Sequence, residues 1–269
     1  EFCSSKNEDI IKNEKINTVF IATRHDSHAD YVIQGLENKK NVFVEKPLCL
    51  NIEELEQIRS LVEKSNNSVM VGFNRRFSPL AVEAKKSFGK TPLSMIYRVN
   101  AGYIPHDTWI QDPEIGGGRI IGEVCHFIDF LSFICDGIPV KVSAISLNEP
   151  ANKMDTITIN IEFENGSIGT ISYYSNGAKS LDKEYVEIYG NGTTVIIKDF
   201  KELFVYCGDK IKKKKLLSQN KGQEDMINSY MSSLNLGKGL ISFKEIYAVT
   251  KATFGIINSI TNGGQQEVI

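Results

Sequence analysis

The sequence predicts a chain of two parts, an α/β fold over residues 1–92 and a mainly antiparallel α+β fold over residues 93–269. Two observations support this prediction. In the first part, short apolar runs alternate with stretches of helical periodicity. In the second part, apolar and polar residues alternate along runs that end in turn signals such as Asn-Gly.

The first part is expected to form a parallel sheet. Its three strands are predicted from apolar runs at residues 17–23, 41–44 and 68–73. Strands that are apolar on both faces are typical of a parallel sheet that is covered on both sides. Asn51 and Glu54 have the spacing of a capping box and predict the start of the helix between the second and third strands. The expected order is therefore βαβαβ.

The second part is expected to form a sheet of about eight strands. Residues 157–163 alternate apolar and polar side chains, and Asn165-Gly166 directly after them favours a tight hairpin. Two more hairpins are predicted at Asn191-Gly192 and Gly208-Asp209. Two helices are expected to close the chain.

Such a large sheet has few helices of its own to cover it. We therefore expect two copies to pack sheet against sheet, as a homodimer or a tetramer, because monomers rarely expose large apolar patches. The apolar face is predicted from Ile157, Ile159, Ile161 and Phe163, extended by Ile168 and the tyrosines Tyr173 and Tyr174.

The composition argues against several classes of partner. Hydrophobic residues make up 41% and charged residues 24%, and no apolar run approaches the roughly 20 residues that span a bilayer. A net charge of -2 without a basic stripe gives no indication of nucleic-acid binding. The five cysteines show no C-x-x-C spacing, so no zinc or other metal site and no disulfide framework is indicated. A cytoplasmic protein that binds a small molecule is expected.

Glu45, Lys46 and Pro47 follow the second apolar run without a break. Ligands of open parallel sheets lie beyond the carboxyl ends of the strands, so this tripeptide is expected at the mouth of a cleft. Pro47 restricts the backbone of Lys46 and so directs its ammonium group. The other open interpretation is an ordinary turn with a solvated lysine.

Residues 116–137 begin with three glycines and continue with a helical pattern. At 100° per residue, one side of this helix would carry Arg119, Glu123, His126 and Asp129. His126 is a candidate general acid and base, with Glu123 one turn earlier able to orient it. A structural histidine beside a surface acid is the alternative interpretation.

Three segments together resemble a known family in order and spacing: "IATRHDSHADYVIQGLENKKNVFVEKPL", "GFNRRFSP" and "GGGRIIGEVCHFID". They resemble the glucose-fructose oxidoreductase/inositol dehydrogenase (Gfo/Idh/MocA) family of nicotinamide-dependent oxidoreductases. The chain is most similar to the module at the C-terminal end of bi-domain proteins whose front half resembles an alcohol dehydrogenase, so fusion to such a domain is expected. The resemblance implies hydride transfer between NAD(H) or NADP(H) and a hydroxyl carbon of a sugar or nucleotide sugar.

The resemblance also implies roles for individual residues. Lys46 would contact the nicotinamide ribose and the reacting hydroxyl, and His126 would be the general acid and base with Glu123 as its partner. Residues flanking the cofactor would be Thr23, His28, Glu45, Lys46, Asn74 and Arg75. Residues bordering the substrate would be Tyr103, His106, Trp109 and Arg119, for which packing or a surface position is the alternative.

The chain departs from the family pattern beside its histidine. Gly122 stands where the family usually has an aspartate, one helical turn before His126. Either Glu123 replaces that carboxylate from a rotated position, or the site lacks its usual partner.

The second departure concerns the dinucleotide fingerprint. No G-x-G-x-x-G turn precedes Ile16, although a Rossmann fold places this turn after its first strand to bind the pyrophosphate. We therefore expect a partial Rossmann fold that lacks its first βαβ unit and binds no dinucleotide tightly. The strand at residues 18–23 is then expected to have an open edge. A non-catalytic sensor or scaffold of the same fold is the alternative function.

Overall fold

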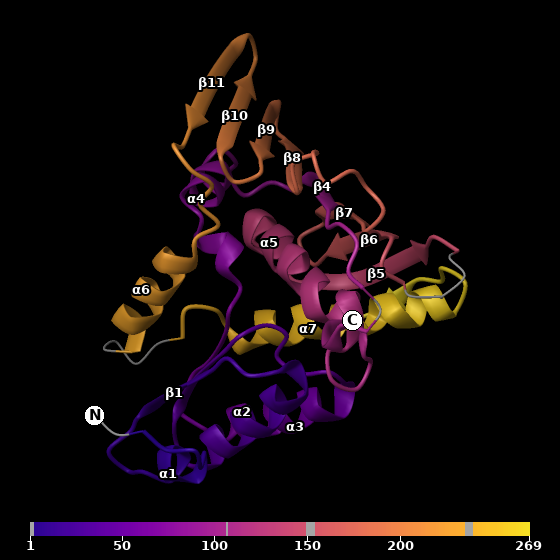
Figure 1. Cartoon of the computed structure of the whole chain (residues 1–269). Coiled ribbons are helices and arrows are strands. Elements are labelled where there is room, and N and C mark those ends of the chain that lie inside the picture. The colour runs from indigo at the N-terminus through magenta and orange to yellow at the C-terminus, as the bar shows by residue number, and fades with distance from the viewer. Residues whose placement is uncertain (1–2, 106, 149–153, 235–238) are drawn as a thin grey trace.

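The computed structural model describes residues 3–105, 107–148, 154–234 and 239–269. A three-stranded sheet lies near the N-terminus and a nine-stranded sheet follows it (Figure 1). Helix α7 (Phe243–Thr261) lies between these parts and packs on β5 (Pro139–Ser146) of the second sheet, on β3 (Val69–Val71) of the first, and on helix α3 (Ile52–Glu63). No helix within the described ranges is long and apolar enough to cross a membrane.

The first sheet is parallel and has the order β1-β2-β3. Its strands are β1 (Thr18–Ile21), β2 (Asn41–Val44) and β3 (Val69–Val71). The short helix α1 (Glu8–Ile11) precedes them, and α2 (His28–Glu37) and α3 (Ile52–Glu63) connect them. The predicted βαβαβ order is confirmed. In the described part of the chain β1 pairs only with β2, so it has the open edge that we expected.

Helix α3 begins where the sequence predicts. The side chain of Asn51 accepts a hydrogen bond from the backbone N–H of Glu54 at 2.9 Å. The carboxylate of Glu54 accepts from the N–H of Leu50 at 2.8 Å, one residue earlier than in a standard capping box. The cap is therefore confirmed with its reciprocal bond shifted by one residue.

The 3₁₀ turn η2 (Asn74–Phe77) and helix α4 (Pro79–Lys86) lead into the second sheet, whose order is β11-β10-β9-β8-β4-β7-β6-β5-β12. Its pairs are antiparallel except for β4 and β7, which are parallel. The strands are β4 (Ser94–Asn100), β5 (Pro139–Ser146), β6 (Ile157–Phe163), β7 (Ile168–Tyr174), β8 (Glu184–Gly190), β9 (Thr193–Lys198), β10 (Glu202–Cys207), β11 (Lys210–Lys215) and β12 (Glu267–Val268).

The histidine-bearing helix differs from the prediction at its start. Residues Ile120–Val124 form the π-helical segment η4, and the α-helix α5 begins only at Cys125 and runs to Cys135.

Short 3₁₀ turns occur at η1 (His25–Ser27) and η3 (Trp109–Gln111), and α6 (Gln223–Leu234) precedes α7. Ser242 caps α7 through the predicted capping box with Glu245.

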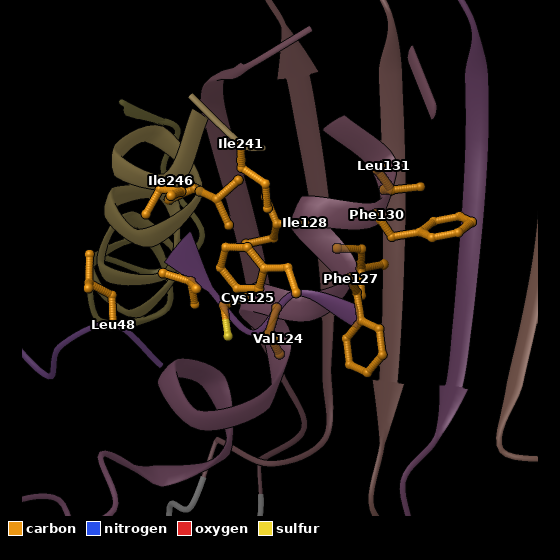
Figure 2. Close-up of a cluster of buried hydrophobic side chains, with 14 of the residues drawn as sticks. Leu48, Val124, Cys125, Phe127, Ile128, Phe130, Leu131, Ile241 and Ile246 are labelled. Carbon is orange, nitrogen blue, oxygen red and sulfur yellow. The ribbon is translucent and has the colours of Figure 1, made fainter. Parts of the chain in front are cut away.

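Helix α5 is buried on nearly all sides because it lies inside the core. Figure 2 shows the apolar side chains at the start of α5 beside Val124 of η4 and among Leu48, Ile241 and Ile246, which come from distant parts of the sequence; those of α5 are Cys125, Phe127, Ile128, Phe130 and Leu131. A helix that is apolar all round is stable only when it is covered on every side. His126 therefore stands on a firmly held element.

The predicted assembly face is wrong in its residues. Ile157, Ile159, Ile161 and Phe163 are at most 2% exposed and belong to the hydrophobic core, as does Tyr173. The alternation is real, but the chain's own helices cover this face. The opposite face exposes large apolar side chains that include Ile168 of the predicted set: Ile96, Ile145, Ile168 and Tyr189.

The strand register places these four side chains on one face of the sheet. We expect two copies to pack through this face, because burying it removes exposed apolar surface from water. Replacing Ile168 by lysine is expected to shift the species seen by light scattering from a dimer or tetramer to a single chain. Ile10→Lys on α1 is the matched control, and a wild-type monomer at micromolar concentration would contradict the prediction.

Candidate functional site

The carboxyl end of β2 directs Lys46 toward the histidine-bearing helix. Its Nζ donates a hydrogen bond to the backbone carbonyl of Gly122 at 2.6 Å, and the side chain is half-buried. The peptide bond between Lys46 and Pro47 is cis. The hydrogen bond to Gly122 fixes Lys46 within the fold, so the interpretation as a freely solvated turn lysine is wrong.

His126 lies in the first turn of α5 and is 8% exposed. Its Nδ1 is sealed from solvent and has no hydrogen-bond partner in the described part of the chain. Burial lowers the pKa of His126 well below its ordinary value, and the positive charges of Arg75, Lys46, Lys183 and Lys221 lower it further. The imidazole is therefore neutral at physiological pH.

Glu123 does not contact His126 in the way we expected. Its carboxylate lies 3.5 Å from Nη2 of Arg119 and 3.7 Å from Nζ of Lys183. Burial opposes ionisation of Glu123, but Lys183 and Arg119 outweigh it and hold its pKa below the ordinary value. The π-helical segment adds a residue to the turn and changes the angle between successive side chains, so the predicted single stripe is not formed.

Arg119 is an internal residue rather than a group beside open substrate space. It is 2% exposed, and its Nη1 donates to the carbonyl of Gly102 at 2.6 Å. Its guanidinium lies over the ring of Tyr173 at 5.0 Å from the centroid. Arg119 thus holds the segment after β4 against the start of the helix, which corrects its predicted role at the substrate.

His28 supports the cofactor side of the site but has no ring nitrogen left for a ligand. It is fully buried, with Nδ1 at 2.7 Å from the carbonyl of Pro47 and Nε2 at 3.2 Å from the carbonyl of Thr23. It thereby links the ends of β1 and β2. Direct contact of His28 with a cofactor stays a prediction.

Thr23 and Glu45 lie at the carboxyl ends of β1 and β2, where a ligand of a parallel sheet is expected. The hydroxyl of Thr23 is exposed and lies 2.7 Å from that of Ser27. The carboxylate of Glu45 lies against Gly72, where a Cβ atom would come within 2.8 Å of Oε2. Both residues therefore remain candidates for the cofactor side.

Arg75 and Asn74 belong to a buried network rather than to the open site. Glu184 accepts hydrogen bonds from Nε and Nη2 of Arg75 at 2.7 and 2.9 Å, from the Tyr97 hydroxyl, and pairs with Lys221 at 2.6 Å. Asn74 donates to the carbonyl of Lys221 at 2.8 Å. Burial opposes ionisation of Glu184, but Arg75 and Lys221 prevail and lower its pKa to about 2. Both side chains thus have partners within the chain, and their contact with a cofactor stays a prediction.

The neighbouring Arg76 makes a second buried pair. Its Nε and Nη2 lie 3.0 and 2.6 Å from the carboxylate of Asp129 on α5, and its Nη1 lies 3.4 Å from Glu245 on α7. Asp129 is therefore occupied by Arg76 and does not belong to the catalytic side of its helix.

The segment after β4 lines a cavity whose lining includes Lys183 but neither Lys46 nor His126. Tyr103 is 61% exposed and lines a cavity of about 440 Å³ together with Lys179 and Lys183. Trp109 is half-buried, with Arg24 above its ring at 5.8 Å. His106, the other residue predicted here, lies outside the described residues.

His25 is a site residue that the sequence interpretation missed. It lies in η1, is 8% exposed, and its Nδ1 is 2.8 Å from the carbonyl of Gly116. Its ring meets that of Trp109 edge-on, with centroids 4.9 Å apart. The available signal was its position, two residues after Thr23 at a strand end of a parallel sheet.

The described residues fit one end of a dinucleotide better than the other. Thr23, Glu45, Lys46 and His126 supply donors and acceptors suited to a nicotinamide and its ribose. Residues 3–17, which precede β1, form only the short helix α1 and contain no glycine turn for a pyrophosphate.

Two domain models of one family match this chain. The model "Oxidoreductase family, NAD-binding Rossmann fold" matches residues 1–73, and "GFO/IDH/MocA C-terminal domain" matches residues 91–196. The chain belongs to the Gfo/Idh/MocA family. The resemblance of its three sequence segments to this family is thereby confirmed.

Two inositol dehydrogenases are among the curated relatives that this chain resembles. A scyllo-inositol 2-dehydrogenase (NAD(+)) of Bacillus subtilis is 29% identical over 174 residues, which are 61% of this chain and 50% of that protein. A myo-inositol 2-dehydrogenase of Thermotoga maritima is 24% identical over 212 residues, which are 75% of this chain and 62% of that protein. The chain spans about half the length of the curated relatives it matches, from 40% to 62%.

A solved structure supports the fold. A levoglucosan dehydrogenase in complex with NADH and levoglucosan superposes with a TM-score of 0.86 at 22% identity, over 99% of this chain and 83% of that one. The Gfo/Idh/MocA architecture of a Rossmann-like parallel sheet followed by a mainly antiparallel sheet is therefore confirmed.

Proposed function

We propose that the protein is an NAD(H)- or NADP(H)-dependent oxidoreductase that acts on a hydroxyl carbon of a sugar, a related polyol or a nucleotide sugar. The observation that carries this proposal is the pair of Lys46 and His126. One is an ammonium fixed at a parallel strand end, and the other is a buried neutral imidazole whose pKa Lys46 helps to lower. The inositol and levoglucosan dehydrogenases among the relatives agree with such a substrate.

Lys46 and His126 have different roles at the substrate hydroxyl. An ammonium group has three donors, and Lys46 uses one of them for Gly122, so the others are available to hold the reacting oxygen. The positive charge stabilises the negative charge that develops on this oxygen as its proton leaves. His126 is neutral and takes this proton as general base. The nicotinamide, when bound, accepts the hydride from the carbon.

The test is reduction of NAD⁺ or NADP⁺ by the natural protein that contains this chain, with a panel of myo-inositol, scyllo-inositol, levoglucosan and a nucleotide sugar. Reduction with at least one member is expected, and a complete absence of reduction with both cofactors would reject the proposal. In that case, NADH binding by the natural protein without turnover would favour a sensor of the same fold. Absence of NADH binding both by the natural protein and by residues 1–269 alone would favour a scaffold.

Residues 1–269 by themselves are expected to bind NADH only weakly. The described residues before β1 form no glycine turn whose backbone N–H groups would hold the charge of the pyrophosphate at a helix N-terminus, and Lys46 cannot replace several such groups. Calorimetry should show no binding in the micromolar range for residues 1–269. Micromolar binding would contradict this prediction and would mean that other described residues hold the pyrophosphate.

A further inference from the structure

Lys46, Gly122 and His25 form one continuous group at the site. Lys46 donates to the carbonyl of Gly122, and a Cβ atom on Gly122 would lie 3.2 Å from Cε1 of His25 and 3.5 Å from its Nδ1. The ring of His25 therefore packs directly on the bare Cα of Gly122. The absence of a side chain at position 122 is what admits an imidazole next to the lysine.

The protonation of His25 follows from its partners. The carbonyl of Gly116 can only accept, so the ring nitrogen that faces it at 2.8 Å, Nδ1, carries the hydrogen. Burial is the main cause that lowers the pKa of His25 to about 4, so the imidazole is neutral at physiological pH. Its second nitrogen, Nε2, then presents a lone pair.

Nε2 of His25 is available to a ligand. It has no hydrogen-bond partner in the described part of the chain, and it is not among the side-chain atoms that are sealed from solvent. The edge-on contact with Trp109 and the bond to Gly116 fix the direction of the ring. Nε2 is thus an oriented acceptor beside a cationic donor.

Two of the charged groups named above are donors, and one of the carboxylates is already occupied. Lys46 and Lys183 present ammonium groups, whereas the carboxylate of Glu123 is already paired with Lys183 and Arg119. Each buried hydroxyl of a bound polyol needs an acceptor for its hydrogen. A buried donor without an acceptor has lost its hydrogen bond to water and gained none in return. His25 supplies such an acceptor.

We propose that His25 is a substrate-binding residue, whose Nε2 accepts a hydrogen bond from a hydroxyl group adjacent to the one that Lys46 holds. The inference rests on the proposed function and adds that the substrate carries neighbouring hydroxyls. A ligand that presents only an acceptor at the second position, such as a ketone or a carboxylate, is selected against. A site built for a hydroxyl leaves its own polar group unpaired with such a ligand.

The test is a double-mutant cycle in the natural protein, with the Michaelis constant for the best polyol of the panel as the measured quantity. His25→Ala should raise the Michaelis constant by about tenfold, the equivalent of one lost hydrogen bond, with NADH affinity unchanged. Gly122→Ala should raise it as well, because the new methyl group displaces the His25 ring. In the His25→Ala background, Gly122→Ala should have no further effect.

Two controls make the outcome decisive. Gly89→Ala is the matched control, since a Cβ atom there meets nothing within 4 Å. His25→Phe keeps a ring of similar size without nitrogen, so it should raise the Michaelis constant as His25→Ala does, and it serves if the alanine variant does not fold. In addition, nitrogen NMR of histidine-labelled wild-type protein should show a shift of Nε2 of His25 when myo-inositol is added to the NADH-loaded protein.

Failure of this inference can be told from failure of the proposed function. If the wild type oxidises a polyol and both His25 variants keep the Michaelis constant within about twofold, His25 is not a substrate-binding residue while the oxidoreductase proposal stands. Additive effects of His25→Ala and Gly122→Ala would likewise contradict the proposed contact. If the wild type oxidises nothing, the proposed function itself is rejected.

Discussion

Lys46→Ala in the natural protein is expected to lower the rate of hydride transfer by at least about 100-fold, the low end for a positioned group in proton-transfer catalysis. The physical reason is that the variant has no cation to stabilise the substrate oxygen as it loses its proton. Single-turnover formation of NADH with an active polyol measures the chemical step directly. The hydrogen bond to Gly122 is also lost, but folding should remain intact because the side chain is only half-buried.

Lys64→Ala is the control for this substitution. Lys64 follows α3, is exposed, and bonds only Ser60 by its side chain in the described structure. It should leave the rate unchanged. Near-normal turnover of Lys46→Ala would remove Lys46 from the mechanism.

His126→Asn is expected to lower turnover by about 100-fold or more while cofactor affinity changes little, because the effect is on the chemical step. The pH dependence has a definite sign. Since burial and four cations lower the pKa of His126 well below 6.5, the base is available above this value and is lost only as pH falls below the folded-state pKa. The acid limb of the wild-type rate profile should therefore lie below pH 6.5 and be absent from the variant.

A structural role for His126 predicts a different result. In that case thermal melts would show a loss of folded protein that parallels the loss of activity. Unchanged melting with an unchanged acid limb would exclude His126 as the general base.

The sequence predicts those parts of the fold that depend on local signals. The parallel strands, the cap at Asn51 and the hairpin at Asn165-Gly166 follow from periodicity and turn chemistry within a few residues. The parallel pairing of β4 with β7 joins strands far apart in the sequence, and no local pattern encodes it. Alternation in residues 157–163 reveals an apolar face but not what covers it.

The site residues also differ in whether local sequence signals predict them. Lys46 and His126 are identified because a strand end and a helical pattern fix their positions. The partner of Arg75 cannot be read from its surroundings in the sequence, since Glu184 is 109 residues away. The roles expected for Glu123 and Arg119 assumed regular α-helical geometry, whereas residues Ile120–Val124 form a π-helical segment. His25 lies within the first of the three segments that resemble the family, but no role was predicted for it, and its proposed role depends on the missing side chain of Gly122.

The two adjacent arginines of η2 restrict how the protein can move. Arg75 is held by Glu184 of the large sheet and Arg76 by Asp129 of α5, and all four side chains are buried. Separating either pair would leave a charge without its partner in the interior, at a cost of about 3–5 kcal/mol for each pair. Hinge-like opening between the small and large sheets is therefore strongly opposed. The two sheets are therefore expected to move as one body, with η2 fixed against β8 through Arg75 and against α5 through Arg76.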